Sequence, residues 1–171
     1  MNPSTITTVT ALQNSYFQGG TAAELMNQLA VHPDSVLVSA ETVKDFQLAP
    51  GDTLNLRLPD SRTHQLVPVP FLYVGVVTEF PTAPKDSFFV ANGDYIAQQT
   101  GNNSVGAFLV DTAGRETTAV ADRIRAVVGT SATVTDITTT RATVGSSLTS
   151  VNLAGLTRIE LGYGVVVAAA A

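Results

Sequence analysis

Alternation of apolar and polar residues is clearest over residues 53–58, where every second side chain is apolar and the others are polar. The apolar positions are Leu54, Leu56 and Leu58. A period of two predicts a half-buried β-strand. The Pro-Gly-Asp sequence within 49–52 predicts a turn before this strand, and residues 59–62 predict a hairpin-type turn after it.

A long β region is predicted over residues 65–80. Pro68 and Pro70 lie inside it, and because proline has no N–H to donate, they indicate a sheet edge or a bulge. Residues 72–77 are almost entirely apolar, which favours a closed, barrel-like core. Gly75 within this run indicates a close approach of another segment, or a bend.

Helical spacing follows a capping-box pattern formed by Thr21 and Glu24. The apolar positions of this predicted short helix are Ala22, Leu25, Met26 and Leu29. The helix is expected to end before His32, which precedes a proline.

Other short elements are predicted from caps and apolar runs. Residues 36–38 and 87–90 read as brief strands, and Ser39 and Asn92 read as N-caps of short helices. Gly101 is expected to end the second of these helices.

Further along, two apolar runs at 105–111 and 133–137 flank a helical pattern at 116–128, with Gly129 after it. This order predicts a β-α-β unit. From Thr138 onward, apolar spacing predicts a long helix.

The sequence therefore predicts an α+β fold with three parts. A β-rich, barrel-like subdomain covers 36–90 and the β-α-β unit covers 91–137, both within one domain, 1–137. A helical stalk then covers 138–171.

Composition narrows the class of protein. Charged residues make up 13% of the chain and hydrophobic residues 44%, and the net charge is -5. Without a basic face to neutralise phosphates, nucleic-acid binding is not expected. No cysteine is present, so thiol chemistry and disulfides are excluded. No signal-peptide pattern opens the chain.

The C-terminal run 161–171 carries no charge. It is shorter than the ~20 apolar residues that span a bilayer. Two interpretations stay open: a flexible tail or buried terminal helix, and the first half of a transmembrane helix.

No motif in the sequence predicts catalysis. His32 and His64 lie at a helix end and in a turn, and neither belongs to a nucleophile or metal-ligand pattern. Phosphate-binding loops are absent and the carboxylates are dispersed at turns. We therefore expect a protein that is not an enzyme and that needs no cofactor and no metal. The alternative is an enzyme whose carboxylates assemble in space.

Three stretches of the chain together resemble a known family. They are Val36-Leu-Val-Ser39, Phe46-Gln-Leu-Ala-Pro-Gly-Asp-Thr-Leu54 and Val69-Pro-Phe-Leu-Tyr-Val-Gly-Val-Val77. In this order they resemble the extracytoplasmic, MacB-like periplasmic core domain of FtsX-like ABC transporter permeases. The predicted β-α-β unit resembles the porter-like subdomain of that family, and 161–171 falls where its second membrane helix begins.

The resemblance implies a non-catalytic domain in the cell membrane, facing the extracytoplasmic side and attached through flanking membrane segments. A cytoplasmic ABC ATPase would drive a conformational change through the helix after Thr138. The partner would be a hydrophobic substrate or a cell-envelope protein. The alternative is a free-standing secreted β-rich binding or adhesion module.

Aromatic residues in the β region are the candidate contacts for a substrate or partner. They are Phe71, Tyr73, Phe80, Phe88 and Phe89. An exposed groove and an ordinary hydrophobic core are both compatible with this pattern.

Overall fold

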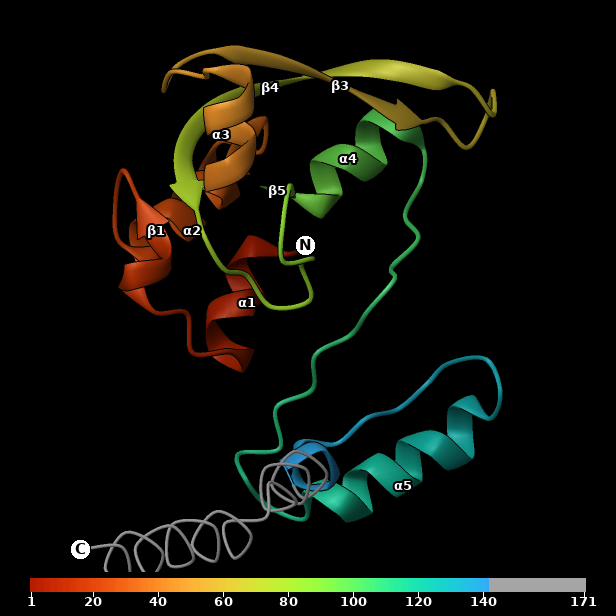
Figure 1. Ribbon diagram of the computed structural model, residues 1–171. Coiled ribbons are helices and arrows are strands. Elements are labelled where there is room, and N and C mark those ends of the chain that lie inside the picture. The colour runs from red at the N-terminus through yellow and green to blue at the C-terminus, as the bar shows by residue number, and fades with distance from the viewer. Residues whose placement is uncertain (142–171) are drawn as a thin grey trace, which may run out of the picture. The chain divides into compact units, whose positions relative to one another are not determined.

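The computed structural model describes residues 1–141 and confirms the predicted α+β class (Figure 1). The chain divides into two compact units, Met1–Asp111 and a second that begins at Thr112. Among the helices of residues 1–141, none has both the length and the apolar character needed to cross a bilayer.

The first unit contains a mixed sheet with helices on both sides. Its helices are α1 (Pro3–Val9), the 3-10 helix η1 (Asn14–Tyr16), α2 (Ala22–Val31), α3 (Ala40–Phe46) and α4 (Gly93–Thr100). Its strands are β1 (Phe17–Gln18), β2 (Ser35–Ser39), β3 (Thr53–Pro59), β4 (Leu66–Val77) and β5 (Phe89–Ala91). The order across the sheet is β1-β4-β2-β5, and β3 forms an antiparallel hairpin with β4.

The predicted helix caps are confirmed. The Thr21 hydroxyl accepts from the Glu24 N–H (3.3 Å), and the Glu24 carboxylate accepts from the Thr21 N–H (2.8 Å), which completes the capping box. Ser39 caps α3 and Asn92 caps α4. Gly101 ends α4 in a left-handed conformation with φ 67°.

The closed barrel predicted from residues 72–77 is wrong. The sheet is open, and this part of β4 is an internal strand with β1 and β2 as its neighbours. One core joins α1 and α2 to one face of the sheet, and a second core joins α3 and α4 to the other face. A strand with both faces covered is apolar throughout, so the run needs no barrel to explain it.

A β-bulge in β4 adds to this apolar run. The parallel register pairs Val36 with Tyr73 but Leu37 with Gly75, so Val74 is an extra residue. Before the bulge, odd-numbered side chains of β4 face the α3 and α4 side, and after it even-numbered ones do.

Gly75 marks a close approach, as the sequence predicts. A Cβ at this position would lie 2.9 Å from the Gln18 carbonyl oxygen and 3.2 Å from the Leu25 side chain. Only a residue without a side chain fits between β1 and α2 here.

Pro68 and Pro70 lie on a part of β4 that has a neighbour on one side alone, which confirms the predicted edge. Both residues pair with β3, while β2 pairs with β4 only from Leu72 onward. The Leu72 N–H donates to the Asp34 carbonyl (2.9 Å), so even-numbered N–H groups point away from β3. The prolines therefore cost no ladder hydrogen bond.

The second unit contains α5 (Thr117–Val128), close to the helix predicted at 116–128, and Gly129 follows it with φ 55°. The predicted β-α-β unit is wrong within the described residues: 105–111 and 133–137 are not strands. A strand exists only with a neighbour to bond, and neither run pairs with one here.

Only the first residues of the helix predicted from Thr138 lie within the described part of the chain. Residues 137–141 are helical. The rest of the predicted stalk, 142–171, and the uncharged run 161–171 within it, lie outside the described residues.

Candidate functional site

Of the five candidate aromatic residues, three are part of the cores. Phe71 and Tyr73 are each 1% exposed and belong to the core under α3 and α4. The Phe71 ring contacts the Tyr95 ring edge to face, with centroids 5.3 Å apart. Burial raises the pKa of Tyr73, with a smaller contribution from Asp52.

The remaining candidates lie toward the other core. Phe88 is buried in the core under α1 and α2, and Phe80 packs against that core while partly exposed. Phe89 is 41% exposed at the β5 edge strand. The five aromatic side chains are thus divided between two faces of the sheet and do not form one groove.

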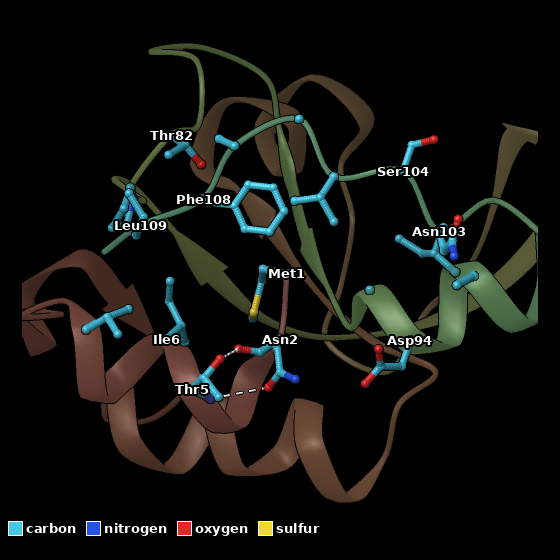
Figure 2. A pocket seen from close by; sticks show the side chains of 18 of the residues that line it. Met1, Asn2, Thr5, Ile6, Thr82, Asp94, Asn103, Ser104, Phe108 and Leu109 are labelled. Atoms are coloured by element: carbon cyan, nitrogen blue, oxygen red, sulfur yellow. Dashed lines mark hydrogen bonds between the residues drawn. The ribbon is translucent and has the colours of Figure 1, made fainter. Parts of the chain in front are cut away.

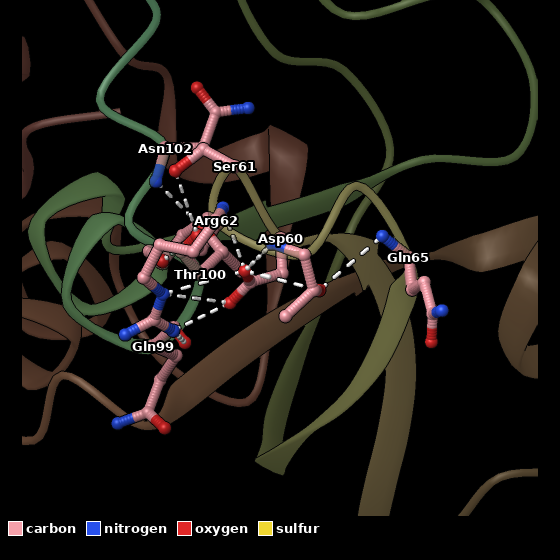
Figure 3. Close-up of polar contacts among 9 residues, drawn as sticks. Asp60, Ser61, Arg62, Gln65, Gln99, Thr100 and Asn102 are labelled. Atoms are coloured by element: carbon pink, nitrogen blue, oxygen red, sulfur yellow. Dashed lines mark hydrogen bonds and ion pairs between the residues drawn. The ribbon is translucent and has the colours of Figure 1, made fainter.

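A polar cluster surrounds Asp60 at the tip of the β3–β4 hairpin (Figure 3). The buried Asp60 carboxylate accepts from the N–H groups of Arg62 and Thr63, both at 2.9 Å, and pairs with the Arg62 guanidinium. Arg62 also donates to the Gln99 carbonyl (3.1 Å), and the Ser61 N–H donates to the Thr100 carbonyl (2.9 Å). The cluster fastens the hairpin to the end of α4.

The ionisation of Asp60 agrees with a structural role in fastening the hairpin to α4. The hydrogen bond from Arg62, followed by that from Thr63, holds the pKa of Asp60 well below its usual range. An acid that is ionised so firmly is a poor proton donor or acceptor near neutral pH. In the described residues, no group of three His, Asp or Glu side chains is arranged to hold a metal.

A pocket of 840 Å³ lies in the first unit (Figure 2). It is built by four segments that are far apart in sequence. They are Met1 to Val9 around α1, the loop 80–82, residues 93–97 of α4, and the extended segment 102–109.

The pocket has an apolar part and a polar part. The apolar part is formed by Ile6, Val9, Phe80, Pro81, Ile96, Val105, Phe108 and Leu109. The polar part is formed by Asn2, Thr5, Asp94, Asn102, Asn103 and Ser104. Phe108 is 81% exposed, and its ring lies beside Met1 in Figure 2. Phe108 and its exposed neighbours Leu109 and Val105 give this side of the pocket an apolar surface that a ligand could cover.

Main-chain hydrogen bonds hold the base of the pocket. The Met1 amine donates to the Ala91 carbonyl (3.1 Å), and the Gly93 N–H donates to the Met1 carbonyl (2.7 Å). The Asn2 side chain caps α1 by accepting from the Ser4 N–H (3.0 Å). These bonds fix the start of α1 against the end of β5.

Asp94 is the only charged side chain among the residues that line the pocket. Burial lowers the pKa of the Met1 amine, while the Asp94 carboxylate opposes this to a smaller extent. No lining residue is lysine or arginine, so the pocket offers no side chain that would pair with an anion.

Sequence reasoning missed this pocket, apart from Phe80. The sequence predicts that the exposed run Phe108, Leu109 and Val110 is part of a strand, and nothing local links it to α1. The sequence carries no local signal that would bring this run to α1.

Comparison of the chain with protein-family models, with curated proteins and with solved structures finds no match.

Proposed function

We propose that this chain is a non-catalytic extracytoplasmic domain of an FtsX/MacB-like ABC transporter permease. One observation carries the proposal beyond the sequence resemblance. The Pro-Gly-Asp turn and the β4 run, two motifs of that resemblance, bond to each other directly. The Gly51 N–H donates to the Tyr73 carbonyl (2.8 Å), and the Tyr73 N–H donates to the Asp52 carbonyl (2.9 Å).

The turn is also stabilised internally. The Ala49 N–H donates to the Asp52 carboxylate (2.7 Å), and the Asp52 N–H donates to the Ala49 carbonyl (3.0 Å). This explains why the turn and the strand occur together: the aspartate shapes the turn, and the turn continues the β4 ladder. The third motif is β2, which lies on the other side of the same strand.

In the proposed role, the sheet with its two cores is a rigid body that moves as a whole. A cytoplasmic ATPase would drive the membrane segments, and the helix that starts at 137–141 would transmit the movement. The domain would then present a hydrophobic substrate for export, or act on a cell-envelope partner. The second candidate, a free-standing secreted binding module, differs in having no membrane anchor.

The test is to locate the protein in its source cells with an antibody raised against this chain. We expect the antigen in the membrane fraction after alkaline carbonate extraction, and we expect protease added outside protoplasts to destroy it while a cytoplasmic marker survives. After solubilisation it should co-purify with a nucleotide-binding subunit and with ATP hydrolysis. A soluble antigen of 17.8 kDa in the medium would support the secreted module and refute the permease.

A further inference from the structure

We propose that the 840 Å³ pocket of the first unit binds a cationic amphiphile, a small molecule with an apolar body and a positively charged head. This names the class of hydrophobic substrate that the proposed function leaves open, and it rests on that function for its biological meaning. The binding itself is a property of the chain and is tested separately.

The size and the apolar wall of the pocket favour a small ligand. Pockets for small molecules typically measure about 300–1,000 Å³ and are lined mostly by apolar side chains with a few polar groups. Here Ile6 of α1 lies across the pocket from Phe108 and Leu109 of the extended segment. Val9 of α1 also lines the pocket. The Phe108 side chain, 81% exposed, gains the most from being covered by an apolar body.

Charge decides which head group fits. Asp94 contributes the only charged side chain of the lining, and the other polar side chains are amides and hydroxyls, which accept a head group of either sign. The first unit as a whole is acidic, with ten Asp and Glu residues against four Lys and Arg residues in 1–111. A cation is therefore attracted and an anion repelled.

The Asp94 carboxylate is available for a ligand. Its own main-chain N–H is used, because it donates to the Asn92 side chain (2.9 Å) as part of the α4 cap. The carboxylate itself lies on the exposed side of the first turn of α4. Among the groups that line the pocket, the Met1 amine is the one cation that competes for Asp94; burial lowers its pKa, so alkaline conditions reduce this competition.

The experiment titrates the whole 171-residue protein with decyltrimethylammonium below its micelle concentration, by calorimetry at pH 8.5 and low salt. Decanoate, with a chain of the same length and the opposite charge, is the comparison ligand. We expect one saturable site for the cation and weaker binding of decanoate. Added salt should reduce the preference, because exposed charges are screened.

Two variants locate the site. Asp94→Asn should weaken cation binding by about two- to fivefold, the effect of one exposed ion pair, without weakening decanoate binding. Phe108→Ser should weaken both ligands by about tenfold, since it removes a large apolar contact. Phe108 is exposed, so near-UV circular dichroism should show an unchanged fold.

Matched controls come from α3, away from the pocket. Phe46→Ser removes another exposed phenylalanine (73% exposed), and Glu41→Gln removes another exposed acid from a first helical turn. Both should leave the affinities unchanged.

The proposal is overturned by any of three results: no saturable binding of the cation, decanoate binding as tightly, or Phe46→Ser weakening binding as much as Phe108→Ser. The last result would place binding elsewhere on the chain. The permease proposal is tested separately, by the location of the antigen in cells. The titration can therefore refute ligand binding without refuting the permease proposal, and the reverse also holds.

Discussion

Gly75 provides the sharpest test of the packing between β4, β1 and α2. A Cβ there would lie 2.9 Å from the Gln18 carbonyl oxygen, and 3.2 Å and 3.3 Å from the side chains of Leu25 and Leu37. The carbonyl oxygen belongs to the main chain of the neighbouring strand, so it can move only if β1 moves. We therefore expect Gly75→Ala to destabilise the first unit.

The magnitude follows from two opposing effects. An extra methyl group in a packed core costs about 1–3 kcal/mol. Alanine also restricts the unfolded chain more than glycine does, which returns about 0.4–1 kcal/mol. The free energy of unfolding should thus fall by about 1–2 kcal/mol. With a urea m-value of about 1–2 kcal/mol/M, the midpoint should fall by about 1 M.

Near-UV circular dichroism suits the assay, because Tyr73 and Tyr95 belong to the core under α3 and α4 and report on the sheet. The control is Gly106→Ala, since a Cβ at that position meets nothing within 4 Å and its φ is not in the left-handed region. The reasoning is refuted if Gly75→Ala unfolds at the same urea concentration as the original protein, or if Gly106→Ala is destabilised equally.

Two further predictions concern the hairpin. Asp60→Asn should lower the unfolding midpoint at pH 7, because it removes the negative charge and replaces the carboxylate oxygen that pairs with the Arg62 guanidinium by an NH2 donor, while the amide oxygen can still accept from the Thr63 N–H. Folding lowers the pKa of Asp60, so this stabilisation is present above the ordinary value of 3.8 and is lost as the pH falls further. The unfolding midpoints of the two proteins should therefore converge when melts are repeated at increasingly acid pH. A constant difference between the midpoints down to the lowest pH would contradict this. Tyr95→Phe removes the hydroxyl that donates to the Pro70 carbonyl (3.0 Å) but keeps the ring contact with Phe71. Urea titration of Tyr95→Phe should show that the free energy of unfolding falls by about 0.5–1 kcal/mol. Tyr95→Leu should lower the free energy of unfolding further, because it also removes the ring. Equal decreases for the two variants would mean that the ring contact contributes nothing.

Local chemistry in the sequence predicts much of the first unit. The capping box of α2, the caps of α3 and α4, the alternation of β3 and the edge position of Pro68 and Pro70 all depend on residues near one another in the chain. Each of these features satisfies its own hydrogen-bonding or packing requirement locally.

Features that depend on distant segments were not predictable in this way. An apolar run such as 72–77 is compatible with a barrel and with a strand covered on both faces, and only the positions of the helices distinguish them. The run 105–111 has the composition of a strand, but strand formation requires a partner that the run itself does not specify. The pocket joins four distant segments, so local patterns do not indicate it.

The extra residue at Val74 has a consequence for how β4 tolerates change. Losing one residue from the middle of a strand normally turns every later side chain to the opposite face. Here the removal of Val74 would instead restore regular alternation, because Tyr73 and Gly75 already point to opposite sides of the sheet. The strand would lose the added twist of a bulge and keep both cores. Single-residue length variation should therefore be better tolerated at this position than at its neighbours in β4.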